Sequence, residues 1–168
     1  MTTTSWFATA GFGAVLLVAA CGSSSSGGNG GNNGMTVAVR STSAGQVLVN
    51  SAGRTLYASD QEKAAGKILC ASGGCQAIWT PLTVSGGTQP SGPAAVADQL
   101  SLVTRPGGRR QVEFKGAPLY TFSFDHAAGD IKGNGEKDSF DGTDFTWHAA
   151  TANGAVPSSG DSNPGYGY

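Results

Sequence analysis

The chain has 168 residues, a formal net charge of −1 and only 12% charged residues. A charge so close to zero, without a stripe of Lys and Arg, argues against nucleic acid as a partner. The 27 glycines, beside many Ser and Thr residues, favour short strands and turns over long helices. Residues 35–150 have the size of one ordinary domain with one hydrophobic core.

An apolar segment, residues 7–20, lies near the start of the chain. It is short for a membrane span but suits the hydrophobic region of a signal peptide. It runs into Val-Ala-Ala-Cys at residues 18–21, which resembles the lipobox of bacterial lipoproteins. The resemblance implies that residues 1–20 are a signal peptide and that Cys21 carries fatty acyl chains such as palmitate, which hold the protein to the outer face of a membrane. The alternative is a buried apolar helix of the folded domain.

Two polar segments flank the predicted domain. Residues 22–34 contain only Gly, Ser and Asn, so they have no apolar side chain to bury. With Cys21 they form the predicted segment 21–34, a lipidated cysteine and a flexible tether that reaches about 20 Å. Residues 151–168 return to Gly, Ser, Asn and Pro, and we expect them to be a disordered tail.

Two further cysteines, Cys70 and Cys75, lie within the predicted domain. In an exported protein such a pair is expected to form a disulfide. A redox-active pair and half of a metal site are the alternatives. A redox pair usually has two intervening residues rather than four, and the sequence has no second cysteine pair to complete a zinc site.

The domain itself is predicted to be mainly β. Valines alternate in residues 36–40 and 46–50, and a turn at residues 51–53 leads into residues 54–57. A second hairpin is predicted for residues 99–115, followed by a strand within residues 117–124. Helical structure is expected only at residues 60–66 and 75–78. We therefore predict a single antiparallel β-domain with short helical turns at most.

The sequence also contains an internal match. Gly-Arg-Thr-Leu-Tyr at residues 53–57 aligns with Gly-Ala-Pro-Leu-Tyr at residues 116–120, and acidic residues follow each tyrosine. Each match follows a predicted valine-bearing strand. The pattern predicts two related hairpin-containing repeats, as a pseudo-twofold axis would arrange them.

The second copy resembles a motif of bacterial secreted-repeat lipoproteins, Tyr-x-aromatic-x-x-Asp. The matching residues are Tyr120, Phe122 and Asp125. The first copy keeps Tyr57 but has Ser59 in place of the aromatic residue; Asp60 comes early, and Glu62 has the spacing of the motif's Asp. We assign Tyr57 and Asp60 to the first copy of the motif. The resemblance covers most of residues 46–148 and implies a family whose biochemical function is not established.

The motif also has a physical interpretation. Tyr120, Phe122 and Phe124 alternate along a strand, so their side chains project from one face. This face is expected to lie in the core, with Asp125 capping the following loop. The alternative is an aromatic platform that stacks a flat ligand or a sugar.

Other chemistry-bearing residues form weaker patterns. Four oxygen-bearing residues have a spacing faintly similar to that of a calcium loop: Asp130, Asn134, Asp138 and Asp141. Lys132 occupies a ligand position there, so a solvated loop is the default. Two histidines, His126 and His148, could with Met35 be ligands of haem or copper, but no Cys-x-x-Cys-His motif accompanies them. No motif selects a nucleophile or an acid–base pair, and we assign no catalytic, metal or cofactor residue.

The sequence thus predicts a lipid-anchored extracytoplasmic lipoprotein that acts as a binding or envelope-associated module. Its predicted partners are the membrane, through the lipid, and an unidentified envelope ligand or protein. A small-ligand or metal carrier is one alternative and predicts a pocket lined by the aromatic motif. A hydrolase of envelope material is the other and predicts two carboxylates facing each other in a cleft.

Overall fold

A computed structural model describes residue 1 and residues 34–154 of the chain. The predicted signal peptide, Cys21, nearly all of the tether and residues 155–168 lie outside the described residues. The described domain is mainly β, and its strand pairs are antiparallel, as predicted. Within the described part of the chain, no helix is long and apolar enough to cross a membrane.

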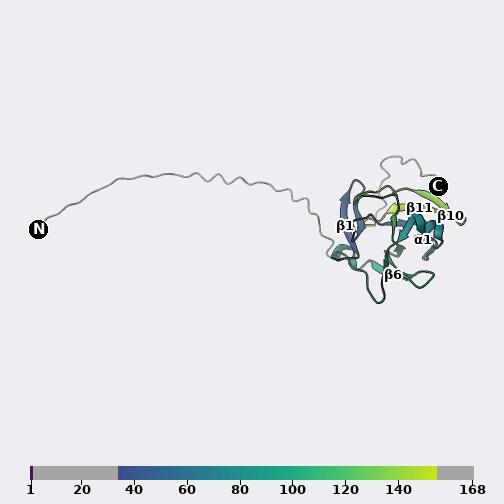
Figure 1. Cartoon of the computed structure of the whole chain (residues 1–168), viewed down its shortest axis with the longest axis horizontal. Helices are drawn as coiled ribbons and strands as arrows, with labels where there is room; N and C mark the ends of the chain where they lie inside the picture. The colour runs from purple at the N-terminus through teal and green to yellow at the C-terminus, as the bar shows by residue number, and fades with distance from the viewer. Residues whose placement is uncertain (2–33, 155–168) are drawn as a thin grey trace. The chain divides into compact units, whose positions relative to one another are not determined.

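The first hairpin is a separate two-stranded sheet at one side of the domain (Figure 1). It pairs β1 (Val37–Thr42) with β2 (Gly45–Asn50). Burial does not follow the predicted alternation, because Val47, Leu48 and Val49 are consecutive and all three are buried. Asn50 then accepts two backbone N–H groups through its side chain, and Gly53 takes a φ of 78°, which brings the chain back toward β2.

The central sheet has five strands in the order β10-β11-β3-β9-β4. Their bounds are β3 (Tyr57–Ser59), β4 (Trp79–Pro81), β9 (Tyr120–Phe122), β10 (Lys137–Phe140) and β11 (Thr143–Ala149). The other sheet has the order β5-β7-β6, with β8 paired to β7. Its bounds are β5 (Thr83–Val84), β6 (Leu100–Thr104), β7 (Arg110–Phe114) and β8 (Ala117–Pro118). The predicted second hairpin is β6 and β7.

Three short helices connect these strands: α1 (Asp60–Ala65), α2 (Gly73–Ile78) and α3 (Ala94–Ala97). The side chain of Ser59 caps α1 by accepting the backbone N–H of Glu62, and Gly66 ends the helix with a φ of 62°. The first two helices cover the segments predicted to be helical. The short helix α3 was not predicted, and it follows Pro93 without a side-chain cap.

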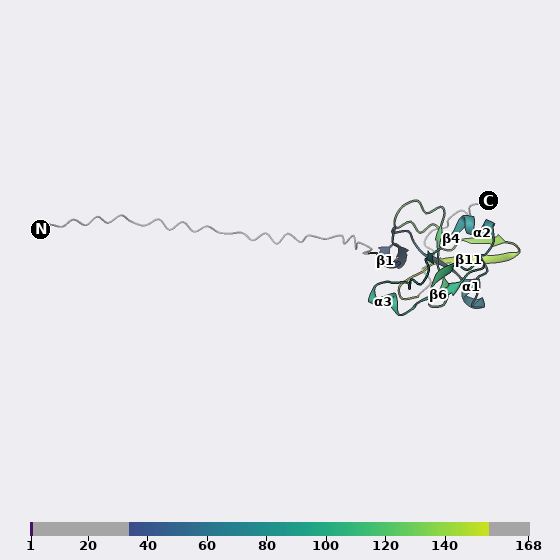
Figure 2. The ribbon, with the colours of Figure 1, turned by 60° about the horizontal axis from the view of Figure 1, so that its bottom comes forward.

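The hydrophobic core has two clusters. One lies against the central sheet and contains most of the aromatic side chains together with the disulfide between Cys70 and Cys75. The other joins the β1–β2 hairpin to the β6–β7 sheet through Val37, Leu56 and Leu119. In Figure 2, β11 and α1 lie beside each other.

Two parts of the domain contact each other through matching sets of backbone contacts. We call these parts the first half (residues 34–84) and the second half (residues 100–151). Strand β3 of the first half and strand β9 of the second half are neighbours, and Tyr57 lies opposite Tyr120. Strand β4 of the first half pairs with β9, and β11 of the second half pairs with β3. The matching hydrogen bonds are Leu82 N–H to Leu119 O at 2.9 Å and Ala150 N–H to Leu56 O at 2.8 Å. A duplicated unit with a pseudo-twofold axis predicts such a pattern.

Two expectations from the sequence need correction. Residues 137–149, part of which we expected to be a solvated loop, form the β10–β11 hairpin, whose turn has positive φ at Asp141 (52°) and Gly142 (75°). An Asp-Gly pair fits this turn, but few β-branched residues flank it, so the strands gave a weak signal. In addition, Thr151 is buried and bridges to Val47, so the domain extends into the segment predicted to be the tail.

Candidate functional site

The residues of the repeated motif meet at the centre of the domain. The hydroxyl of Tyr57 donates to the carboxylate of Asp125 at 2.6 Å, and the hydroxyl of Tyr120 donates to the carboxylate of Glu62 at 2.9 Å. Each tyrosine therefore contacts an acid from the other half. We call these contacts the tyrosine–acid pairs. All four side chains are buried, with relative exposures of 0% or 1%.

The acid of the first half is Glu62, not Asp60. Glu62 stands five residues after Tyr57, as Asp125 stands five residues after Tyr120. The helix α1 turns Glu62 inward, while Asp60 at its first residue is exposed and lies 3.2 Å from His148. The spacing of five residues from the tyrosine indicated Glu62. The assignment of Asp60, which followed the residue type of the motif, is wrong.

Glu62 also fixes the segment that leads to the disulfide. Its Oε1 accepts the backbone N–H groups of Leu69 (2.8 Å) and Cys70 (2.9 Å), in addition to the Tyr120 hydroxyl. The disulfide itself joins Cys70 and Cys75 with their Cα atoms 5.5 Å apart, and both cysteines are buried. The pair is therefore a structural link inside the core, as predicted.

Arg105 is a buried cation beside this pair, with 3% exposure. Its guanidinium donates to the Tyr120 hydroxyl at 3.2 Å, to the Cys70 carbonyl oxygen at 2.6 Å and to the side chain of Gln111. Arg105 lies within the hairpin predicted for residues 99–115, and no pattern in the sequence indicated its role. Its charge balances that of buried Glu62, with the tyrosine hydroxyl between them.

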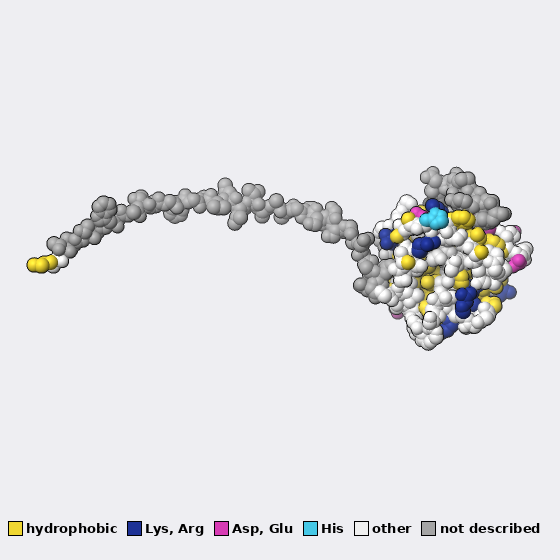
Figure 3. Space-filling model, viewed as in Figure 1, with side chains coloured by type: hydrophobic (Ala, Val, Ile, Leu, Met, Phe, Trp, Pro, Cys, Tyr) yellow, Lys and Arg dark blue, Asp and Glu magenta, His cyan; other side chains and the backbone are white. Residues whose placement is uncertain are grey.

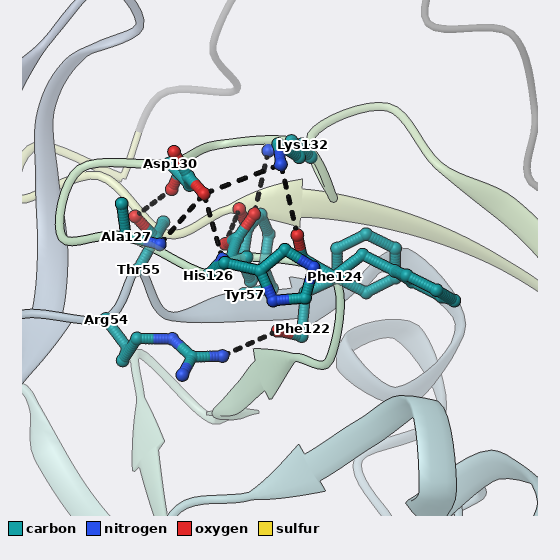
Figure 4. Close-up of polar contacts among 10 residues, drawn as sticks. Arg54, Thr55, Tyr57, Phe122, Phe124, His126, Ala127, Asp130 and Lys132 are labelled. Atoms are coloured by element: carbon teal, nitrogen blue, oxygen red, sulfur yellow. Dashed lines mark hydrogen bonds and ion pairs between the residues drawn. The ribbon is translucent and has the colours of Figure 1, made fainter.

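The loop after β9 is built around Asp125 and Asp130, and Figure 4 shows the contacts of Asp130. Asp125 also accepts the backbone N–H of Lys132 at 3.0 Å, which closes the loop onto Tyr57. Asp130 accepts the backbone N–H groups of His126 (2.9 Å) and Ala127 (3.0 Å). Asp125 and Asp130 therefore act as loop-capping acceptors, and the exposed His126 ring has no part in these contacts.

The electrostatics of the tyrosine–acid pairs follow from burial. Burial and the nearby Asp125 raise the pKa of Tyr57, and burial and nearby Glu62 raise the pKa of Tyr120. Burial also raises the pKa of Asp125, although its hydrogen bond from Tyr57 acts in the opposite direction. The tyrosines thus remain protonated donors at neutral pH, which suits a structural role and not that of a base or nucleophile.

The aromatic side chains of the motif are packed in the core. Phe122 is fully buried and stacks on Trp79 with ring centroids 4.4 Å apart. Trp79 in turn stacks on Trp147 at 4.0 Å, and the two indole N–H groups donate to opposite oxygens of Asp138, at 2.6 and 3.0 Å. Phe124 is only partly buried and packs edge-on against Phe122. The core interpretation of the motif is confirmed, and the aromatic-platform alternative is wrong for Phe122.

The proposed calcium ligands point to different partners. Asp130 caps its own loop, Asn134 accepts the backbone N–H of Ala149 at 3.0 Å, and Asp138 binds the two indoles. Among the residues that the structure describes, no group of three or more His, Cys, Asp or Glu side chains could hold a metal ion. The role of Asp138 was missed because its partners, Trp79 and Trp147, are far apart in the sequence.

Fold and site together define a small β-domain closed by two buried tyrosine–acid pairs and one disulfide. Residues 101–151 match a family described as a secreted repeat of unknown function. The match starts in β6, includes Tyr120, Phe122 and Asp125, and ends at Thr151. It confirms, over the second half, the resemblance to secreted-repeat lipoproteins. No curated protein and no solved structure matches the chain.

Proposed function

We propose that this protein is a lipid-anchored extracytoplasmic module that binds a ligand at the surface of its β-domain. The secreted-repeat match supports an extracytoplasmic location. The Val-Ala-Ala-Cys sequence at residues 18–21 and the Gly/Ser/Asn segment that follows support the lipid anchor. An acylated cysteine followed by a polar tether would hold the domain clear of the lipid headgroups.

The proposal that the domain binds a ligand at its surface depends on one observation, the burial and hydrogen bonding of the motif's polar groups. Tyr57, Tyr120, Glu62 and Asp125 are all buried and bonded to one another across the two halves. A hydrolase would need such acids in a water-accessible cleft. The motif residues therefore stabilise the domain, and we place the binding function on the surface of the domain. On the face in Figure 3, Lys and Arg side chains lie in separate places and do not form a stripe.

Replacement of the lipidated cysteine tests the anchor. Cys21→Ala should move the protein from the membrane to the soluble fraction, or leave an uncleaved precursor, because the acyl chains supply most of the membrane affinity. Radiolabelled palmitate should label the wild-type protein and not the Cys21→Ala variant. The matched control is the double variant Cys70→Ser, Cys75→Ser, which should still be labelled. Membrane retention of a mature-length Cys21→Ala protein would rule out the anchor.

A further inference from the structure

The outer edge of β6 carries backbone groups without partners. The backbone N–H of Arg105 donates to Arg109 O at 2.8 Å, so the odd-numbered residues along this strand face β7. Successive residues of an antiparallel strand direct their N–H and C=O groups to opposite sides. The even-numbered residues therefore face outward, where β6 is the last strand of its sheet. These residues are Leu100, Leu102 and Thr104, and no residue that the structure describes bonds to their backbone groups.

Composition also sets β6 apart from the other edge strands. Exposed edges usually carry a charge, a proline or very few residues, which prevents pairing with another chain. The edge strand β10 includes Lys137 and Asp138, β4 ends at Pro81, and β5 has only 2 residues. Strand β6 has 5 residues without a charge or a proline, and none of them is buried. It is therefore well suited to accept another strand.

The first half shows how the same edge can be protected. The offset that aligns Tyr57 with Tyr120 also aligns β1 with β6, and it places Arg40 opposite Val103 in the alignment. The backbone N–H of Val37, at the start of β1, donates to Ser91 O at 2.9 Å. Strand β1 thus has a charged residue and a partly occupied edge, whereas β6 has neither.

We propose that two copies of this chain associate by antiparallel pairing of their β6 edges. A twofold axis at Leu102 places Leu102 opposite Leu102 of the second copy and Leu100 opposite its Thr104. These are the residues whose backbone groups face outward, so each pair can exchange both of its N–H···O bonds. The axis would join the two β5-β7-β6 sheets into one continuous sheet. The proposal goes beyond ligand binding and depends on neither the ligand nor the lipid anchor.

The side chains are compatible with this self-pairing. The register places uncharged Ser101 opposite Val103 of the second copy, so no like charges face each other across the axis. The ends of the strand differ in charge, because exposed Asp98 precedes β6 and exposed Arg109 lies in the turn that follows it. Antiparallel pairing brings Asp98 of one copy toward that turn of the other. This complementarity favours a second copy of the chain as the partner.

The dimer should be weak, since a single strand pair forms a small interface. Interfaces that bury less than about 1,200 Å² are typical of transient association. We therefore expect a dissociation constant between about 10 μM and 1 mM. Sedimentation equilibrium over this concentration range, with the full chain carrying Cys21→Ala, measures it.

Cysteine pairs test the register. The proposed axis places Ser101 and Val103 of different copies in a pair with Cα atoms about 4.5 Å apart, which a disulfide can bridge. A mixture of Ser101→Cys chains and Val103→Cys chains, each also carrying Cys21→Ala, should therefore form a crosslinked heterodimer under mild oxidation. A mixture of Ser101→Cys and Ser85→Cys chains should not, because Ser85 is exposed but lies outside β6.

Two matched pairs of variants test the edge itself. Thr104→Pro removes an outward N–H and should weaken the dimer by at least about 10-fold, the factor for 1.4 kcal/mol, while Thr104→Val keeps the N–H and should not. Ser101→Lys places a charge on the edge, as natural edge strands do, and should also weaken the dimer. It should fold, because Ser101 already contacts the Glu113 carboxylate at 3.1 Å, which a lysine can pair with. Ser101→Thr is its control.

The contrary results are distinct. A monomer at every concentration up to about 1 mM would overturn the proposal and leave the edge to a strand of another protein. A dimer that Ser101→Lys and Thr104→Pro leave unchanged would place the contact elsewhere on the chain. If Thr104→Pro does not fold, the Ser101→Lys and Ser101→Thr pair still decides. Residues 1–34 are the same in all variants, so only the change in β6 can account for a difference between them.

Discussion

Tyr57→Phe should destabilise the domain, and by an amount that depends on pH. The substitution removes one hydroxyl, which donates to the buried carboxylate of Asp125 at 2.6 Å. A hydrogen bond to a charged group contributes about 1.5–3 kcal/mol to the free energy of unfolding, against about 0.5–1.5 kcal/mol for a neutral pair. At pH 8 we therefore expect a loss of about 1.5–3 kcal/mol.

The sign of the pH dependence follows from Asp125. Burial raises its pKa in the folded state, so its contribution to stability is greatest below the ordinary pKa near 4 and is lost as the pH rises through the raised value. The Tyr57 hydroxyl opposes this rise in pKa because it stabilises the ionised carboxylate. Its removal should therefore cost more as the pH rises and the carboxylate loses its proton, so the loss should be larger at pH 8 than at pH 4.

Urea denaturation at pH 4 and pH 8 measures both losses. The control is a double-mutant cycle with Asp125→Asn, which keeps the shape of the side chain but does not titrate. In that background Tyr57→Phe should cost about 0.5–1.5 kcal/mol at either pH. A loss that is the same at the two pH values in the wild-type background would refute the reasoning.

Three further predictions concern the core. Phe122→Ala should lower the free energy of unfolding by about 3–5 kcal/mol, measured by chemical denaturation; a melting temperature within a degree or two of wild type would contradict its core role. Cys70 and Cys75 should give no free thiols in the unfolded, unreduced protein, and their joint replacement by Ala should cost about 2 kcal/mol. Gly133→Ala should cost about 1–3 kcal/mol, because the added Cβ would lie 2.8 Å from an indole carbon, whereas Gly73→Ala, with open space around it, should be neutral or stabilising by calorimetry.

Local patterns in the sequence predicted much of the fold. The alternation of valines predicted β1 and β2, and the hairpin predicted for residues 99–115 corresponds to β6 and β7. The pairing of distant strands was not predictable in this way. Strands β4 and β11 each pair with a strand of the other half, and no local preference encodes which strands become neighbours.

The residues of the candidate site divide in the same way. Sequence patterns identified some of them, and the tertiary fold determines the contacts of the others. The motif identified Tyr57, Tyr120 and Asp125, and their alternation with Phe122 predicted a core face. The exchange of partners between the halves, which places Glu62 with Tyr120, depends on the tertiary fold. Arg105 was missed for a related reason: a basic residue next to a turn is usually solvated, and only the buried Glu62 makes its burial favourable.

The exchange of β4 and β11 between the halves has a consequence for folding. When only the first half of the chain is available, β3 lacks both β9 and β11, and Tyr57 lacks its acceptor until Asp125 follows 68 residues later. The folding nucleus therefore cannot form until most of the chain is present. This predicts slow folding, dominated by contacts between residues far apart in the sequence. A single repeat unit of this kind could complete its sheet only by pairing with a second copy, so one unit alone would be expected to fold as an intertwined dimer.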